Sequence, residues 1–283
     1  MEIKEPIREF HYRVAWRTNS PYPGFHPGIS AGEGFEFQRH QNLIDNPNPR
    51  HLDLHASAQD PFGQFLVRSF KQRGRIPVQI IADLSASMAF NGKRQKLQTL
   101  IEFLQSAAWA TSRTGDALAF HACSDQIHWQ YHLPLKWYKR PPTQLWEQLA
   151  NIKLTGSAQA LERIAEYLGS RPSLVFLVSD FHFELDQLRQ ILENLIRHDV
   201  VPMVIWDEHE QLNIANGSYF TIEDAENGET RSLMMRPALR KLITDSFKQH
   251  KNDITRLCHQ YGRRPFFIEQ GFDPDTMTRY FFS

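Results

Sequence analysis

Hydrophobic and polar positions follow two distinct periods along most of the chain. Continuous apolar runs with β-branched residues are typical of buried strands, and they occur at residues 77–85, 116–125, 173–181, 200–207 and 263–270. Apolar residues at helical spacing predict helices over 93–115, 143–152, 157–169, 184–199, 237–261 and 273–282. Alternation predicts a partner strand at 126–135, and the polar stretch 211–235 favours short strands. This order predicts an α/β fold with three layers, in which helices cover both faces of a mostly parallel, doubly wound sheet.

The first 75 residues have a different texture. Breaker-rich stretches, "TNSPYPGFHPGISAGEGFEF" at 18–37 and "DNPNPR" at 45–50, favour turns and short strands over long helices. Aromatic residues recur among them, which indicates a segment that packs rather than a disordered tail. We therefore predict an irregular, β-rich extension over residues 1–75 and an α/β domain over 76–283.

Composition narrows the function classes. The chain has 283 residues with 32 Lys plus Arg and 32 Asp plus Glu, so its net charge is zero and a general nucleic-acid binder is not indicated. Such a chain has little long-range field, and recognition should depend on a local site. The N-terminus lacks the apolar core of a signal peptide, and no window approaches the roughly 18 apolar residues of a membrane span. Cys123 and Cys258 are expected to be buried free thiols, so we expect a cytoplasmic protein.

Polar residues interrupt the first strand pattern in "IADLSASMAF". Asp83, Ser85 and Ser87 alternate with apolar residues, which places one carboxylate and two hydroxyls on one side of an extended strand end. Asp180 ends another predicted strand, and Thr155 precedes a predicted helix. Ligands of parallel sheets bind at such strand ends, and hard oxygen ligands suit Mg²⁺, Mn²⁺ or Ca²⁺. This set leaves an octahedral shell incomplete, so a bound ion could attract an Asp or Glu of a partner.

These motifs resemble a known site. "DLSASM" is similar to the Asp-x-Ser-x-Ser motif of the metal-ion-dependent adhesion site of von Willebrand factor A domains. "TGSAQAL" resembles the second loop of that site, where Thr is followed five and six residues later by Ala-Leu, and "LVFLVSDF" resembles the strand whose terminal Asp completes it. The resemblance implies a magnesium shell of Asp83, Ser85, Ser87, Thr155 and Asp180.

The upstream segment points to a subgroup. Residues 49–88, "PRHLDLHASAQDPFGQFLVRSFKQRGRIPVQIIADLSASM", resemble the DUF58 family, in which a "PRxIDWxxSAR"-like box and a "LxVRxF" stretch precede the A-domain strand. Leu54 and Gln59 replace the usual Trp and Arg of that box, and Lys153-Leu154 replace a typical Gly-Gly before Thr155. DUF58 proteins are commonly associated with MoxR-type AAA+ ATPases, so the resemblance implies such an ATPase or its client as partner.

Several residues have alternative interpretations. Ser157 is a rival to Thr155 as ligand, although it is also placed to cap the following helix. His182 could border the site because it lies two residues after Asp180.

Other polar clusters lie outside this set. Three residues share one face of an extended segment and could bind zinc: His51, Asp53 and His55. The alternative is that Asp53 has a structural role. "DEHE" at 207–210 could be a second site or a solvated loop. Arg68, Lys71, Arg73 and Arg75 form either a solvated face or a surface for an acidic partner.

The chain lacks the motifs of common enzymes. It has no Gly-x-Ser-x-Gly elbow, no Walker A loop and no Gly-x-Gly-x-x-Gly. A phosphatase with Asp83 as nucleophile is an alternative, but Ser85 stands where such enzymes often carry a second Asp. We therefore expect an adaptor rather than an enzyme, which captures a partner carboxylate through Mg²⁺. A metal-free scaffold with the same fold is a further alternative.

Overall fold

The structure is a computed structural model that describes residues 8–20, 22–32, 36–90, 95–207, 219–223, 230–234 and 236–283. The chain forms two compact units. One unit comprises Arg13–Ile76, and the other comprises Pro77–Ser283 together with the described part of the N-terminal segment, residues 8–12. The predicted boundary between residues 75 and 76 stays a prediction.

The larger unit is built on a six-stranded sheet with the order β11-β8-β7-β4-β5-β6. All neighbouring pairs are parallel except β5 and the edge strand β6, which are antiparallel. Its strands, in chain order, are β4 (Pro77–Asp83), β5 (Ala117–Cys123), β6 (Leu133–Lys136), β7 (Leu174–Ser179), β8 (Asp199–Ile205) and β11 (Phe266–Ile268). The prediction of a mostly parallel, doubly wound sheet is confirmed, and this is the fold expected of a von Willebrand A-like domain.

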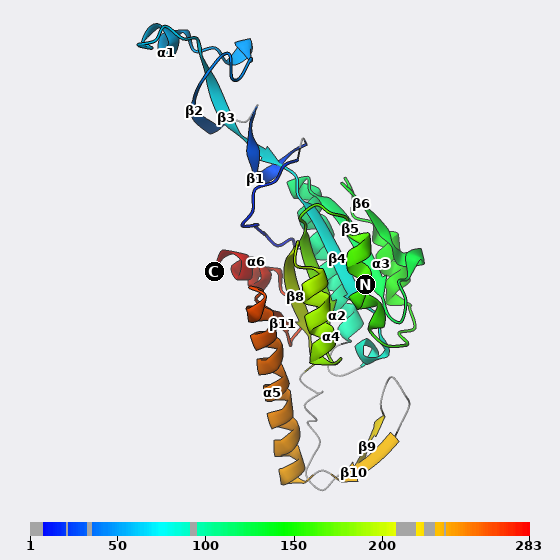
Figure 1. Ribbon diagram of the computed structural model, residues 1–283. Helices are drawn as coiled ribbons and strands as arrows, with labels where there is room; N and C mark the ends of the chain where they lie inside the picture. Colours follow the sequence, from blue (N-terminus) through cyan, green and yellow to red (C-terminus); the bar gives the residue numbers. More distant parts are fainter. Residues whose placement is uncertain are drawn as a thin grey trace. The chain divides into compact units, whose positions relative to one another are not determined.

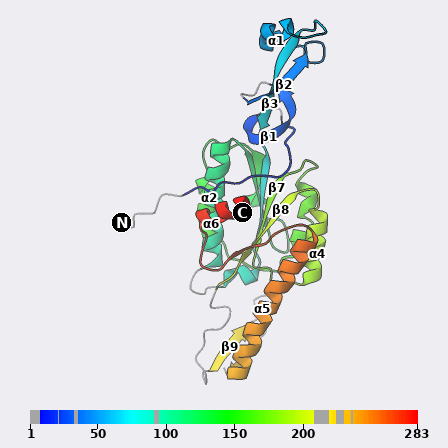
Figure 2. The same cartoon turned by 90° about the vertical axis from the view of Figure 1, so that its left-hand side faces the viewer.

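Helices cover both faces of this sheet (Figures 1 and 2). In Figure 2, α2 and α6 lie on one side of the strands, and α4 and α5 lie on the other. The helices of this unit are α2 (Lys96–Thr114), α3 (Thr143–Ala150), α4 (Leu185–Asn194), α5 (Pro237–Gln260) and α6 (Pro274–Phe282). A separate two-stranded ribbon consists of β9 (Tyr219–Glu223) and β10 (Thr230–Met234), as the polar stretch predicted.

Strand β7 shows how the two faces acquire separate cores. Successive side chains of a strand point to opposite faces. Val175 and Leu177 belong to a cluster that α4 and α5 complete. Phe176 points the other way and packs edge-on against Phe103 of α2, with ring centroids 5.2 Å apart. Because both faces are covered, the strand is buried at every position, which explains its continuous apolar run.

Two of the predicted elements differ from the structure. Residues 157–169 do not form one helix but two 3-10 turns, Gln159–Glu162 and Ile164–Tyr167. Groups outside this segment take its backbone partners: Ser124 O accepts the N–H of Ala160, and Gln187 of α4 donates to Ala158 O. The strand predicted at 126–135 is also wrong in position. Residues Trp129–Tyr131 form a 3-10 turn, and the strand β6 covers only Leu133–Lys136.

Most helix and strand ends match the pattern more closely. Helix α2 stops at Gly115, which adopts a left-handed conformation with φ of 74°, as the predicted stop requires. Helix α4 ends at Asn194 rather than at residue 199, because β8 already begins at Asp199.

Among the described residues, no helix has the length and apolar character that crossing a membrane requires.

The smaller unit contains a three-stranded antiparallel sheet with the order β1-β3-β2. Its strands are β1 (Pro23–Gly32), β2 (Glu36–Asn42) and β3 (Leu66–Gly74). Between β2 and β3 the chain forms a 3-10 turn, Pro49–His51, and a short helix, α1 (Leu54–Ala58). The expected β-rich character of this region is confirmed.

Candidate functional site

The predicted polar residues converge where two central strands end. Strands β4 and β7 are parallel neighbours, and the chain places β5 on one side of β4 and β7 on the other. The carboxyl ends of β4 and β7 therefore form the topological switch point, where α/β sheets bind ligands. Asp83 is the last residue of β4, and Asp180 directly follows β7.

Asp83 is completely buried, and both of its carboxylate oxygens accept hydrogen bonds. Its Oδ1 accepts the backbone N–H of Ser85 at 2.8 Å, and its Oδ2 accepts the hydroxyl of Ser179 at 2.6 Å. The same Ser179 Oγ accepts the backbone N–H of Phe181 at 3.0 Å. Asp83 thus ties the loop after β4 to the end of β7.

The two serines connect the first loop to the second carboxylate. Ser85 Oγ lies 3.1 Å from Ser87 Oγ, and the Ser87 hydroxyl lies 3.2 Å from Asp180 Oδ1. Four of the five predicted ligands, Asp83, Ser85, Ser87 and Asp180, therefore form one connected cluster. We call these four residues the oxygen cluster.

The structure adds Lys96, which the spacing of the polar residues along the sequence does not predict. Its ammonium lies 2.7 Å from Asp180 Oδ2 and donates to the backbone carbonyl of Ser87 at 3.2 Å. Both side chains of the ion pair are only 1% exposed. Lys96 is the first residue of α2 and precedes Leu100 and Phe103 on the buried side of that helix. A lysine on the apolar stripe of a helix is the signal that could have identified it.

The two carboxylates differ electrostatically. Burial, together with the charge of Asp180, raises the pKa of Asp83 to about 6. Burial acts in the same direction on Asp180, but the ammonium of Lys96, together with His182 and the hydroxyl of Ser87, outweighs it and lowers the pKa of that carboxyl below its usual value. Asp180 is therefore the carboxylate that stays ionised most readily, and Asp83 is the one that holds a proton into mildly acidic solution.

The second loop approaches the first through its backbone. The N–H of Ala86 donates to Gly156 O at 2.9 Å, which places residues 155–157 beside the loop after β4. Asp125 Oδ1 accepts both the backbone N–H and the hydroxyl of Ser157, at 2.7 and 2.6 Å. Thr155 is exposed and makes no hydrogen bond within the described residues. Ser157 is thus engaged elsewhere, whereas Thr155 lies beside the cluster without a bond to it.

A group of aromatic residues supports the segment after Asp180. The indole N–H of Trp206 donates to the Asp180 carbonyl at 2.7 Å. Phe181 is buried and has a φ of 55°, a left-handed conformation that is rare for a bulky residue. His250 of α5 donates to the Phe181 carbonyl at 2.8 Å. The exposed ring of His182 stacks on Trp206, with centroids 6.0 Å apart, so His182 borders the site through its backbone and ring.

The donor set of the oxygen cluster fits a hard cation. Mg²⁺ binds oxygens at about 2.0–2.1 Å in near-octahedral geometry, so neighbouring ligand oxygens lie about 3 Å apart. The separations of 3.1 Å between the serine hydroxyls and 3.2 Å between Ser87 and Asp180 are close to that spacing. The ammonium of Lys96 adds a positive charge beside Asp180 that a metal ion must tolerate. The ligand roles of the five residues stay a prediction.

The possible zinc trio is not assembled. Asp53 pairs with His40 and Arg68 instead of His51 and His55. Across the described part of the chain, no group of three or more His, Cys, Asp or Glu residues could hold a metal ion. The oxygen cluster is of a different kind, because two of its four residues supply hydroxyls.

The remaining candidates are the two cysteines and the segment "DEHE" at 207–210. The two cysteines, Cys123 and Cys258, are buried and free, as expected, and burial raises the pKa of Cys258 to about 12. In the segment "DEHE", Asp207 is buried, and residues 208–210 lie outside the described residues.

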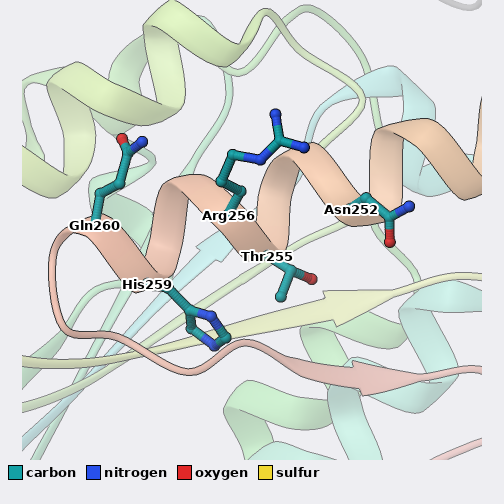
Figure 3. A pocket seen from close by; sticks show the side chains of 5 residues that line it. All are labelled: Asn252, Thr255, Arg256, His259 and Gln260. Atoms are coloured by element: carbon teal, nitrogen blue, oxygen red, sulfur yellow. The ribbon is translucent and has the colours of Figure 1, made fainter.

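A hollow of about 530 Å³ lies along α5 (Figure 3). Its side chains all come from that one helix: Asn252, Thr255, Arg256, His259 and Gln260. Figure 3 shows that they point in different directions instead of converging on one point. None of the predicted site residues lines this hollow, so it is not the chemical centre.

Comparison with solved structures gives distant similarities. The chain is 10% identical to an aerotolerance-related membrane protein from Bacteroides fragilis that carries multiple mutations to serine; the match covers 72% of this chain and 95% of that one, with a TM-score of 0.41. It is 12% identical to the conserved hypothetical protein BatB from Bacteroides thetaiotaomicron, with coverage of 71% and 95% and a TM-score of 0.41. The PilB minor pilin from Streptococcus sanguinis is 9% identical over 79% of this chain and 64% of its own, with a TM-score of 0.39. These similarities carry no inference about function.

Sequence comparison gives a more specific result. No curated protein matches the chain. The model of one family, described as protein of unknown function DUF58, matches residues 48–253. This range includes the box around Asp53, the oxygen cluster and most of the sheet. Since the match spans well over half of the chain, the protein belongs to the DUF58 family.

Proposed function

We propose that this protein is a protein-binding adaptor without catalytic activity, whose recognition site is the oxygen cluster with Thr155. The observation that carries the proposal is the convergence of Asp83, Ser85, Ser87 and Asp180 at the switch point of the sheet, linked by hydrogen bonds. Such an edge is where α/β sheets bind ligands.

The residues proposed to hold a cation are Asp83, Ser85, Ser87, Thr155 and Asp180. Mg²⁺, or Mn²⁺ or Ca²⁺, would supply a positive charge with a coordination position for a carboxylate oxygen from outside. Hydroxyl ligands add no negative charge to the site, and Lys96 offsets that of Asp180. The protein side chains would therefore leave the site attractive to an Asp or Glu on a partner.

The partner proposed from the family resemblance is a MoxR-type AAA+ ATPase or a client that it remodels. The adaptor would bring the two together during assembly or maturation of a complex. A test is the association of this protein with a MoxR-type ATPase from the same genome, measured in excess Mg²⁺ and in chelator. Binding that is lost in chelator and in Asp83→Ala supports the proposal, and equal binding in both solutions contradicts the metal-dependent mechanism.

One observation favours the metal-free scaffold as a second candidate. The Lys96 ammonium already provides a buried counter-charge for Asp180, so the cluster is neutralised in part without a metal ion. A calorimetric Mg²⁺ titration separates the two candidates, because the scaffold takes up no ion.

The site does not favour the hydrolase alternative. A nucleophilic Asp83 would have to reach a substrate, but its side chain is completely buried and both of its oxygens accept hydrogen bonds. A generic phosphatase assay of the wild type against Asp83→Asn tests this alternative, and we expect no activity that depends on Asp83.

A further inference from the structure

In the smaller unit, one face of the β2–β3 pair carries charged and aromatic residues. Side chains at every second position of a strand share a face, so Arg68 and Phe70 of β3 lie on the same side. Their cross-strand partners on β2 are His40 and Phe37. Val67 and Ser69, the residues on either side of Arg68 in β3, point to the other face and are buried.

Asp53 holds Arg68 in a fixed position on this face. Its Oδ2 accepts the Nε–H of Arg68 at 2.7 Å and lies 3.1 Å from His40 Nε2. Its Oδ1 accepts the backbone N–H of Ala56 at 3.0 Å, which caps α1. The Ser57 hydroxyl donates to the Asp53 carbonyl and accepts the N–H of Leu66, which joins α1 to β3. Three contacts therefore hold the carboxylate of Asp53 in place.

This arrangement leaves donors of Arg68 available to a ligand. Its Nε is used by Asp53, whereas its two terminal nitrogens have no partner in the described part of the chain. The side chain of Arg68 is 55% exposed although its inner end is anchored. An arginine held in this way loses little conformational freedom when it binds.

Arg68 lines a hollow of about 300 Å³. A second arginine, Arg50, lines the same hollow. Arg50, in the turn Pro49–His51, is exposed and has no acidic partner among the residues that the structure describes. Apolar walls come from Leu54, which is 69% exposed, and from Phe70, against which the ring of His51 packs edge-on at 5.1 Å. Asp53 is the only acidic residue among those that line the hollow.

Charge and shape together define what this hollow can bind. Two guanidinium groups against one carboxylate, which is already paired with Arg68, give it a net positive charge. Planar guanidinium groups match the geometry of a carboxylate, which they bind with paired hydrogen bonds. A volume of about 300 Å³ is at the lower end of ligand pockets, which suits one residue of a peptide.

We propose that the hollow formed by Arg50, Arg68, Leu54 and Phe70 binds a peptide carboxylate that lies next to an apolar side chain. The carboxylate is supplied either by the C-terminus of a partner protein or by an acidic side chain. This site lies within the smaller unit and uses none of the residues of the oxygen cluster. In this proposal the role of Asp53 is to position Arg68, which binds the carboxylate.

The test is a titration of the ¹⁵N-labelled full chain followed by NMR. N-acetyl-leucine presents a terminal carboxylate beside an apolar side chain, and the dipeptide N-acetyl-leucyl-glutamate with an amidated C-terminus presents a side-chain carboxylate beside the same apolar side chain. N-acetyl-leucinamide lacks the carboxylate, and inorganic phosphate offers a different anion. Saturable shifts at residues 50–54 and 66–70 with either carboxylate support the proposal, and the tighter of the two identifies the source. Equal shifts with N-acetyl-leucinamide, or saturation by phosphate alone, contradict it.

Variants make the assignment specific. Arg50→Gln should weaken carboxylate binding by about tenfold or more, the effect of losing one charge-assisted contact. Arg50 has no partner within the described residues, so this variant tests binding without disturbing the fold. Arg68→Gln should have at least the same effect, and Arg39→Gln, an exposed arginine of β2 outside the hollow, is the matched control.

The site is also separable from the oxygen cluster. Asp83→Asn should leave carboxylate binding at the hollow unchanged, so failure of the metal site does not mask the result. Unchanged affinity in Arg50→Gln overturns the proposal.

Discussion

The ammonium of Lys96 lies 2.7 Å from Asp180 Oδ2, and both side chains are 1% exposed. This buried ion pair adjoins the hydroxyls of Ser85 and Ser87. With both Asp83 and Asp180 ionised, the three charged groups together carry one negative charge. The pair therefore lowers the demand of the cluster for an external cation.

Replacing Lys96 by Met should destabilise the protein strongly without metal. A buried charge that loses its partner costs about 3–5 kcal/mol, so the free energy of unfolding should fall by that amount in chelator. The same variant should bind Mg²⁺ more tightly than the wild type, because a positive charge beside Asp180 is gone. Denaturant unfolding with and without Mg²⁺ measures both effects.

Two controls accompany this variant. The double variant Lys96→Met with Asp180→Asn removes both charges and should recover much of the lost stability. Lys251→Gln breaks the pair with Glu269, whose side chains are 40% and 44% exposed, and should change stability by about 0–1 kcal/mol. A Lys96→Met variant as stable as Lys251→Gln would show that the buried pair does not stabilise the fold.

The raised pKa of Asp83 predicts a pH dependence of stability. The folded state keeps this proton up to about pH 6, whereas the unfolded chain releases it near the ordinary pKa of 3.8. The folded state therefore binds more protons in this window, and stability falls by up to about 3 kcal/mol as pH rises through it.

Asp83→Asn isolates this effect because asparagine does not titrate. The difference in unfolding free energy between wild type and Asp83→Asn, measured in chelator, should shift by roughly 2 kcal/mol between pH 4 and pH 7, in favour of the variant at pH 7. A difference that stays constant with pH would contradict the raised pKa.

Gly156 should be intolerant of a side chain. It has a φ of +80°, and an added Cβ would lie 2.0 Å from Asp125 Oδ2, the carboxylate that holds Ser157. Gly156→Ala should therefore displace the second loop and weaken Mg²⁺ binding through Thr155. Its stability loss should exceed the roughly 1–2 kcal/mol that a left-handed alanine costs by itself.

Gly169→Ala is the matched control for that variant. Gly169 has a φ of +77°, but an added Cβ would meet no atom within 4 Å. The comparison of the two variants by thermal unfolding separates the clash from backbone strain. Equal losses would mean that Asp125 yields to the new side chain.

The sequence predicts much of the site because its residues follow strand ends. Asp83, Ser85 and Ser87 are two residues apart, and Asp180 directly follows a neighbouring strand, so parallel pairing brings them together. Lys96 could not be recognised in this way. A lysine at a helix start normally extends into solvent, and its burial depends on how α2 packs beside Asp180.

The fold, too, could be predicted from the sequence only in part. The buried strands β4 and β7 follow directly from their apolar runs. The pattern at 157–169 is helical in sequence but forms 3-10 turns, because Ser124 and Gln187 bind its backbone from distant segments. Local periodicity does not contain such contacts, and tertiary partners override it.

The most direct test of the proposed function is a calorimetric titration of the purified protein with Mg²⁺. We expect one Mg²⁺ per chain in the wild type and in Asp186→Asn, whose exposed carboxylate on α4 pairs with Arg189. We expect no binding in Asp83→Asn that retains the native fold. Absence of Mg²⁺ binding in the wild type, or equal binding in Asp83→Asn, would rule out the proposed metal site and favour the metal-free scaffold.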